Sequence, residues 1–309
     1  MDETVAATAL PRPPAWMRLL GRVPMPVMQA LAHPLAFLLR DLLRVRRTVA
    51  RENLARSLPE LDAAQRRRIE RGHYLSVSQV LLELPRMAVM PPGELRRRVA
   101  VPDLPHLRAE LAAGEALLVL SSHQCNWEWL LQVLAVELRA PFIAAYKPPH
   151  SDAADRLMIA MRSRFGVRMV PGKRLLREVL RRRGQAHIVA MVADQMPTTS
   201  AGRVWLEFLG RDTAFFPGPG EIARVGAYRA YFLALRRLRP GYYEVRFEQL
   251  CVPGEDLDVA TFTARYAARV EAHVRAHPAD WAWTHRRWKA VPGHGDAAGA
   301  DSAGSADES

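Results

Sequence analysis

A histidine and a glutamate five residues apart stand at the point of the chain best suited to acid–base chemistry. The apolar run 118–120 ends in Ser121 and Ser122, His123 follows, and Glu128 begins the next helix-forming stretch. Ligands of open α/β sheets bind just past the carboxyl ends of strands, which is where His123 would lie. Histidine is also the side chain that most readily takes and returns a proton near neutral pH. His123 is therefore predicted to be a general base.

The spacing of His123 and Glu128 limits how the two side chains can meet. On a regular helix, residues five apart differ in direction by about 140° and do not face each other. Contact requires His123 in the turn before the helix and Glu128 in its first or second turn. There the carboxylate would accept the Nδ1 proton, fix the tautomer and stabilise the imidazolium, as in serine hydrolases. We therefore predict that Glu128 orients His123, with a substrate hydroxyl in place of the enzyme serine.

Cys125 offers an alternative nucleophile, because it lies two residues from His123. A small residue packed under a helix is the more common use of such a cysteine. The second cysteine, Cys251, is distant in sequence, so neither a disulfide framework nor a zinc cluster is indicated, and a reducing compartment fits. The histidines show no metal-ligand spacing, and no cofactor is predicted. His285 and the tryptophans around it are interpreted as packing residues.

Short apolar runs alternate with helix-forming stretches from residue 116 onwards. This alternation predicts an α/β domain with a mixed, largely parallel central sheet of about seven strands flanked by helices. The predicted strands are 116–120, 142–146, 167–170, 187–193, 204–208, 228–235 and 242–247. The predicted helices are 126–138, 154–164, 173–183, 218–226 and 255–277.

Both ends of the chain and its N-terminal segment differ from this domain in composition. Residues 1–14 are polar and contain three prolines, and residues 291–309 are rich in Gly, Ala, Ser and acidic residues, so both are predicted to be disordered. Residues 15–43 are apolar but interrupted by arginines and prolines. This favours a helical segment that lies on a membrane surface over one that spans it, and a hairpin packed on the body is the alternative. Residues 44–290 form the predicted catalytic domain.

The formal net charge of +12 is concentrated before the C-terminal tail. Four acidic residues and no basic ones follow Lys289, so residues 1–289 carry +16. This sign suits an anionic partner: nucleic acid, an anionic membrane face or an acidic protein. A non-catalytic basic module is thus the rival class of function. No nucleic-acid-binding motif is present and the basic residues are scattered, so a nucleic acid partner is not expected.

An ordered series of short motifs accompanies His123 and Glu128. The pair resembles the His-x4-Asp/Glu motif of glycerolipid acyltransferases. Its surroundings, over roughly residues 16–290, resemble the lipid A late acyltransferases of the lauroyl/myristoyl type. The pair alone is a weak signal, whereas the whole series in this order is specific. The series comprises Arg47–Leu54, Leu58–Leu61, Tyr146-Lys147-Pro148, Arg162–Gly166, Ala193-Asp194-Gln195, Phe208-Leu209-Gly210, Pro217-Gly218-Pro219 and Trp281–Lys289.

The resemblance implies direct transfer of a fatty acyl group in a ternary complex, with His123 removing the proton of the acceptor hydroxyl. It implies an acyl-carrier protein thioester, or acyl-CoA, as donor and a lipid A precursor as acceptor. Another glycolipid, an aryl-polyene-type lipid or a lysophospholipid stays open as acceptor. The expected location is the cytoplasmic face of the bacterial inner membrane, with peripheral or monotopic attachment to an anionic lipid surface. Four residues are expected to bind substrate or brace the site: Lys147, Arg164, Asp194 and Gln195. Lys147 and Arg164 are also candidate donors to an oxyanion.

Overall fold

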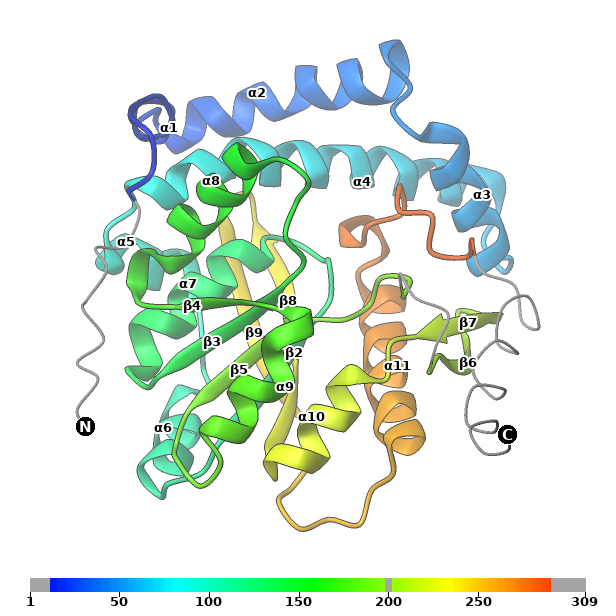
Figure 1. The fold of residues 1–309 in the computed structure, drawn as a ribbon. Coiled ribbons are helices and arrows are strands. Elements are labelled where there is room, and N and C mark those ends of the chain that lie inside the picture. The colour runs from blue at the N-terminus through cyan, green and yellow to red at the C-terminus, as the bar shows by residue number, and fades with distance from the viewer. Residues whose placement is uncertain (1–11, 198–201, 290–309) are drawn as a thin grey trace, which may run out of the picture.

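The computed structural model describes residues 12–197 and 202–289 and is built around a seven-stranded sheet. Its strand order is β1-β9-β8-β2-β5-β3-β4, and each neighbouring pair is parallel except the antiparallel pair β8 and β9. The predicted mixed, largely parallel α/β sheet is therefore confirmed (Figure 1). The strands are β1 (Val99–Ala100), β2 (Leu117–Ser121), β3 (Phe142–Tyr146), β4 (Arg168–Pro171), β5 (Ile188–Val192), β8 (Arg229–Arg239) and β9 (Tyr242–Cys251).

Helices cover both faces of the sheet, and β2 shows how the two cores arise. One face is covered by α5 (Pro92–Arg98), α6 (Leu104–Ala112), α7 (Trp127–Leu138) and α8 (Asp152–Arg162), and the other by α9 (Gly172–Arg181), α10 (Gly218–Gly226) and α11 (Val259–Ala276). All of β2 is buried, as expected for a central strand. Leu117 and Val119 belong to the first core and Leu118 and Leu120 to the second, since successive side chains point to opposite faces. The carboxyl end of β2 is thereby fixed from both sides.

The N-terminal part of the chain forms a further helical layer across one side of the domain. It consists of α1 (Ala15–Leu20), α2 (Met25–Phe37), the π-helix η1 (Leu38–Leu42), α3 (Arg47–Ser57), α4 (Ala63–Glu83) and the 3-10 helix η2 (Leu84–Ala88). Figure 1 shows α2 and α4 side by side, and their residues are in contact. Met25, Met28 and Ala32 of α2 are buried. Residues 15–43 are therefore helical, as predicted, and one side of α2 is packed on the body.

The prolines of this segment do not break it in the way the sequence suggested. Pro24 is the N-cap of α2, Pro26 lies in the first turn, and α2 continues through Pro34. The first turn of a helix tolerates proline because its N–H groups have no intrahelical partner. Among the described residues, no helix combines the length and apolar character that a membrane span requires.

Two strand assignments differ from the prediction. Residues 204–208 form a strand, β6 (Val204–Phe208), but it pairs only with β7 (Arg211–Phe215) in a separate antiparallel hairpin. Leu209 and Gly210 both have positive φ, which suits a two-residue hairpin turn and folds the chain back before β6 can join the sheet. The seventh strand of the sheet is instead β1, whose two residues are too few to give a periodic signal.

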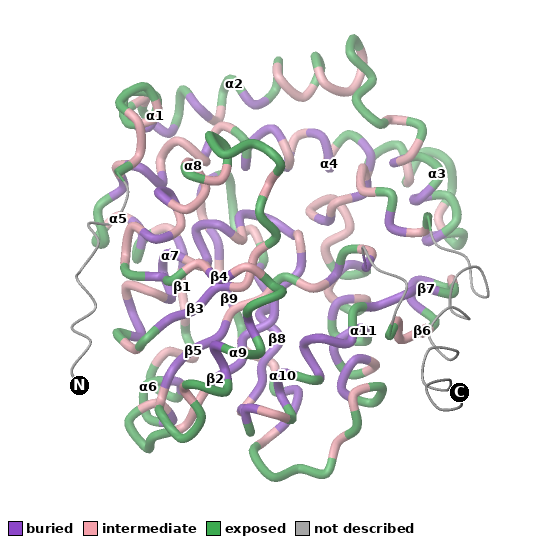
Figure 2. The backbone as a smooth tube through the Cα atoms, viewed as in Figure 1, coloured by how far each residue is buried: buried purple, intermediate pink, exposed green. Residues whose placement is uncertain are grey.

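The remaining elements are the 3-10 helices η3 (Ser163–Phe165) and η4 (Pro278–Asp280). The five predicted helices at 126–138, 154–164, 173–183, 218–226 and 255–277 correspond to α7, α8, α9, α10 and α11. The predicted disorder of residues 1–14 and 291–309 falls outside the described part of the chain except at residues 12–14. Figure 2 shows buried backbone in the strands and exposed stretches along the N-terminal helical layer.

Candidate active site

His123 and Asp194 meet at the carboxyl ends of two neighbouring strands. His123 follows β2 and Asp194 follows β5, and Ser121 at the end of β2 is paired in register with Val192 at the end of β5. Two residues beyond this pair, the His123 Nδ1 lies 2.6 Å from Asp194 Oδ1. The His123 backbone N–H donates to Asp194 Oδ2 at 3.0 Å. The pairing of β2 with β5 therefore brings together residues separated by 71 positions in the sequence.

The Asp194 carboxylate determines which nitrogen of His123 carries the proton. Asp194 is buried, and burial alone would raise its pKa. The imidazole and backbone N–H of His123, together with the indole of Trp281, outweigh burial and hold the pKa of Asp194 below its ordinary value. An ionised carboxylate can only accept, so Nδ1 carries the proton and Nε2 is left with its lone pair. This is the protonation pattern that a general base requires.

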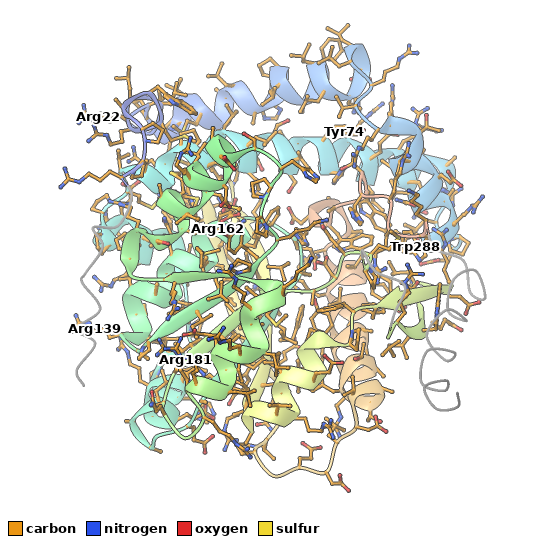
Figure 3. All side chains as sticks on the ribbon, in the orientation of Figure 1. Arg22, Tyr74, Arg139, Arg162, Arg181 and Trp288 are labelled. Atoms are coloured by element: carbon orange, nitrogen blue, oxygen red, sulfur yellow. The ribbon has the colours of Figure 1, made fainter. Side chains whose placement is uncertain are left out.

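Glu128 does not take the position that the His-x4-Glu spacing predicted. The local geometry is as expected, because Asn126 caps α7 and Glu128 lies in its first turn while His123 lies before it. The Glu128 carboxylate, however, accepts two hydrogen bonds from Arg162, one of them from Nε at 2.8 Å. Arg162 lies at the end of α8 and is labelled in Figure 3. The prediction that Glu128 accepts the Nδ1 proton of His123 is therefore wrong, and Asp194 takes that place.

The Glu128–Arg162 pair is largely shielded from water. Burial would lower the pKa of the Arg162 guanidinium, but the hydrogen bonds and charge of Glu128 raise it above its ordinary value. The side chains of Arg162 and Glu128 are only 21% and 11% exposed, respectively. A planar guanidinium held by two parallel bonds has a fixed direction, so Glu128 fixes the orientation of the Arg162 cation.

A pocket of about 290 Å³ opens next to His123. Trp127 packs edge-on against the imidazole with ring centroids 5.0 Å apart, and it also lines the pocket. The polar part of the lining includes His123, Glu128, Tyr146, Lys147, Arg162 and Gln195. The apolar part comes from the sheet and from α7 and α8, and includes Val119, Leu130, Leu134, Ala144, Met158, Met169, Ala190 and Leu233. The pocket thus combines a candidate base with other polar groups and with an apolar part, which we call the apolar chamber.

The other predicted substrate-binding residues separate into two groups. Lys147 and Gln195 line the pocket. Arg164 is not among the lining residues: its Nη1 donates to the backbone carbonyls of Met87 and Met90, at 2.8 and 2.6 Å. Burial lowers the pKa of Arg164. Its contacts are those of a brace between η2 and η3, and the pocket arginine is Arg162, two residues earlier in the same sequence motif.

Cys125 has the environment of a packing residue. It is buried, and burial raises the pKa of its thiol well above the ordinary value, so the thiolate is disfavoured. Its backbone adopts a positive φ and its N–H donates to the Asp280 carbonyl at 3.3 Å. The residue therefore shapes the turn between His123 and α7 and does not offer an activated nucleophile.

Trp281 and Arg162 were not predicted as site residues. Trp281 belongs to the closing segment, residues 281–289, and its Nε1 donates to Asp194 Oδ2 at 2.8 Å. Both residues lie in the motifs that carried the family resemblance. Position in a motif was the available signal, but neither residue stands next to His123 or Glu128 in the sequence.

Comparisons with known proteins identify the family. The family model for bacterial lipid A biosynthesis acyltransferases matches residues 14–290. The chain is 26% identical over 299 residues to the lipid A biosynthesis lauroyltransferase of Escherichia coli (strain K12), covering 93% of this chain and 95% of that protein. It is 26% identical over 245 residues to the phosphatidylinositol mannoside acyltransferase of Mycolicibacterium smegmatis, covering 77% and 78%. The palmitoleoyltransferase of lipid A biosynthesis in Escherichia coli (strain K12) is 22% identical over 276 residues, with 88% of each chain covered.

The length of the family match decides between the two classes of function that the charge left open. A non-catalytic basic module would not be expected to match an enzyme family over residues 14–290. The chain belongs to the bacterial lipid A biosynthesis acyltransferase family, whose members are O-acyltransferases.

Proposed function

We propose that this protein transfers a fatty acyl group from a thioester donor to a hydroxyl of a lipid A precursor or related lipid, with His123 as the general base. One observation carries the proposal: His123 has its Nδ1 held by the buried Asp194 and borders a pocket of about 290 Å³ with an apolar chamber. A base beside an apolar chamber fits a reaction between an acyl chain and a polar hydroxyl.

The chemistry requires one proton to move twice. His123 Nε2 takes the proton of the acceptor hydroxyl as its oxygen attacks the thioester carbonyl, and the resulting imidazolium is stabilised by Asp194. When the tetrahedral intermediate collapses, the carbon–sulfur bond breaks and the imidazolium returns the proton to the leaving thiolate. Arg162 and Lys147 are the cations that line the pocket and are our candidates for stabilising the oxyanion. Arg164 is not, because backbone carbonyls engage its guanidinium.

The apolar chamber is proposed to hold the acyl chain. Each buried methylene contributes about 0.8 kcal/mol, so the depth of the chamber would select the chain length. Ala144 on β3 and Ala190 on β5 are small side chains that line the chamber. Ala190→Leu should therefore shift the preferred donor to shorter chains while turnover with the shortest accepted donor is retained. An unchanged order of preference among donors of different length would argue against this placement.

The central test compares His123→Ala with His150→Ala, a substitution of an exposed histidine. The assay measures transfer of a labelled acyl group to a lipid A precursor in mixed micelles. His123→Ala should lower kcat by at least about 10²-fold with the melting temperature preserved, and His150→Ala should leave it unchanged. A folded His123→Ala variant with near-normal turnover would overturn the proposed mechanism.

The donor is proposed to be an acyl-carrier protein that docks on α9. This helix begins directly after β4, at the same edge of the sheet as His123, and Arg174 acts electrostatically on Tyr146 of the pocket. Leu176 and Leu180 are 46% and 51% exposed between basic side chains. The exposed cations of this face are Lys173, Arg174, Arg177 and Arg181, the last of which is labelled in Figure 3. A basic face with exposed leucines suits a small acidic carrier protein.

Carrier docking is tested by salt and by charge reversal. The kcat/KM for the acyl-carrier donor should fall steeply between about 50 and 300 mM salt, over which the Debye length shortens through about 8–10 Å, while kcat at saturating donor changes little. Reversing Arg177 and Arg181 to Glu should reproduce the high-salt value. The control reverses Arg269 and Arg275 of α11, which changes the net charge equally. A flat salt response, or equal use of acyl-CoA, would exclude carrier docking without affecting the role of His123.

The N-terminal helical layer is proposed to rest on the cytoplasmic face of the bacterial inner membrane. Large apolar side chains are exposed along α1, α2, η1 and the turn that follows: Trp16, Leu19, Leu20, Val27, Leu31, Phe37, Leu38, Leu42, Leu43 and Val45. Arginines intersperse them, including Arg22, which is labelled in Figure 3. Exposed apolar side chains with basic neighbours are typical of a surface that inserts shallowly into anionic lipid.

Vesicle flotation tests this attachment. Wild type should float with vesicles that contain anionic phospholipid, and Leu42→Glu combined with Leu43→Glu should reduce the floating fraction. Leu176→Glu, on α9, should leave it unchanged. If both variants float like wild type, the N-terminal layer is not the attachment surface.

A different glycolipid is the second candidate acceptor. The relative named as a phosphatidylinositol mannoside acyltransferase is as similar in sequence, at 26% identity, as the relative named as a lauroyltransferase. Mass spectrometry of total lipids from a deletion strain separates the candidates, because the lipid that loses one acyl group is the acceptor.

A further inference from the structure

Both oxygens of the Asp194 carboxylate have hydrogen-bond partners, and the partners of the two oxygens differ. Oδ1 lies 2.6 Å from His123 Nδ1. Oδ2 accepts from the His123 backbone N–H at 3.0 Å and from Trp281 Nε1 at 2.8 Å. One donor on Oδ2 thus comes from the histidine's own backbone, and the other comes from a distant part of the chain. The carboxylate cannot rotate without losing at least one of these bonds.

Trp281 is held firmly enough to act as a fixed donor. It is buried, and its ring lies edge-on to Trp283 at 4.8 Å and to Phe208 at 5.9 Å between ring centroids. Its backbone forms a bridge with Gln124, the residue after His123. The preceding residue, Asp280, accepts the backbone N–H of Cys125. Trp281 is therefore fixed to the same turn that carries the histidine.

We propose that Trp281 is a positioning residue for the base, through the hydrogen bond from its indole N–H to Asp194. It acts on Asp194 and not on the substrate, and this inference rests on the proposed function of His123. The indole N–H fixes Oδ2, so Oδ1 faces Nδ1 and the imidazole keeps the tautomer with a free Nε2. It also draws negative charge from the carboxylate, which limits how strongly the carboxylate retains the imidazolium proton.

Asp194 interacts electrostatically with titratable groups from several elements. His123 faces it from the turn after β2, Tyr266 from α11, and His285 and Arg287 from the closing segment. Arg287 is 2% exposed, stacks over Phe215 at 4.5 Å, and within the described residues its guanidinium has no hydrogen-bond partner. Burial lowers its pKa to about 10, against the opposing effect of Asp194 and Tyr266. Arg287 thus supplies positive charge near Asp194, whereas Trp281 supplies the directed bond.

The closing segment provides matched controls for an experiment. Trp281→Phe removes the N–H and keeps an aromatic ring in the cluster. Trp283→Phe and Trp288→Phe remove equivalent bonds, from Nε1 to the Pro278 carbonyl at 2.6 Å and to Thr213 Oγ1 at 2.7 Å. Neither of these bonds involves Asp194. The three variants therefore lose the same chemical group from the same aromatic cluster, and only one of them changes the environment of the base.

The measurement is the pH profile of kcat/KM for the full chain in micelles. Trp281→Phe should lower kcat/KM about 10-fold at neutral pH and move the acidic limb about half to one pH unit upward. The direction follows because a carboxylate with one donor fewer holds the imidazolium proton more tightly, so a higher pH is needed to free the base. The two controls should keep the wild-type acidic limb whatever their melting temperatures. An unmoved limb in folded Trp281→Phe, or an equal shift in the controls, overturns the inference.

A second measurement covers the case in which Trp281→Phe does not fold. In wild type labelled with ¹⁵N at tryptophan, the Trp281 indole resonance should follow pH as the His123–Asp194 pair changes charge, and His123→Ala should abolish that response. The Trp283 and Trp288 indoles should not respond. No pH response at Trp281 overturns the inference. Activity in His123→Ala would instead refute the proposed function, so the two failures are distinguishable.

Discussion

Replacing Asp194 with asparagine should remove nearly all activity while preserving the shape of the site. In the wild type, Oδ2 accepts two N–H bonds, from the His123 backbone and from Trp281. The amide oxygen of the introduced asparagine must occupy that position, because an NH₂ group there would face two donors. The NH₂ group is then left at the position of Oδ1, 2.6 Å from Nδ1. There it donates to Nδ1 and forces the ring proton onto Nε2, the nitrogen that should accept the substrate proton.

The wrong tautomer sets the size of the effect. The same substitution in a histidine–aspartate pair of a serine protease lowers kcat by about 10⁴-fold with the geometry intact, and we expect a loss on that order here. Single-turnover transfer of a labelled acyl group isolates the chemical step from binding and product release. The melting temperature should change little, since asparagine has the shape of aspartate. The comparison variant is Glu128→Gln, which weakens the bond to Arg162 and should cost only about 10- to 100-fold.

The test is which of the two variants, Asp194→Asn or Glu128→Gln, loses more activity. If Glu128→Gln is the more severe and Asp194→Asn retains more than about a tenth of wild-type activity, Glu128 orients the base after all and the reasoning from Asp194 is refuted. A loss of folding in Asp194→Asn would be visible as a lowered melting temperature.

Three further predictions concern the Glu128–Arg162 pair, Cys125 and His73, a buried residue of α4. Glu128→Gln and Arg162→Met should each lower the unfolding free energy by about 3 kcal/mol, because breaking a shielded ion pair leaves an unpaired charge. The double variant should lose scarcely more than either single variant. Additive losses in a double-mutant cycle measured with denaturant would contradict this. Cys125→Ala should keep most turnover in the transfer assay, and a folded but inactive variant would restore the thiol alternative. Burial lowers the pKa of His73 from 6.5 to about 4, so the unfolded chain binds a proton first as the pH falls. His73 alone should contribute about 3 kcal/mol to the drop in unfolding free energy between pH 7 and pH 4. The drop should therefore be smaller in His73→Leu by about that amount, and the exposed-site control His150→Gln should behave like wild type.

The fold could be predicted largely because its buried strands and flanking helices have distinct apolar periods. β3 has the bounds predicted from the sequence, and α10 does as well. The apolar pattern could not predict which strands pair with each other. The run 204–208 is a strand by composition, but its partner was decided by the tight turn at Leu209 and Gly210, which pairs it with β7 outside the sheet.

The sequence predicted where His123 lies relative to the strands, but not which carboxylate its Nδ1 contacts. His123 follows the strand end as expected, and Asp194 was named as a candidate from its own motif. The hydrogen bond between them depends on β2 and β5 being neighbours, which is a property of strand order and is absent from local spacing. Glu128 was favoured because it is close in sequence, yet the first turn of α7 directs its carboxylate toward α8.

The closing segment also makes the order of synthesis relevant to activity. The turn that carries His123 is bridged through Gln124 to Trp281, and Asp194 depends on the same tryptophan for one of its bonds. A ribosome-bound chain that has emerged only to Asp194 already contains the N-terminal helices, the base and its carboxylate, but not the donor that fixes them. The hydrogen bonds around Asp194 are thus completed only after the C-terminal part of the chain has been synthesised and folded. A chain that ends before Trp281 would therefore lack one of the three hydrogen bonds that hold the Asp194 carboxylate.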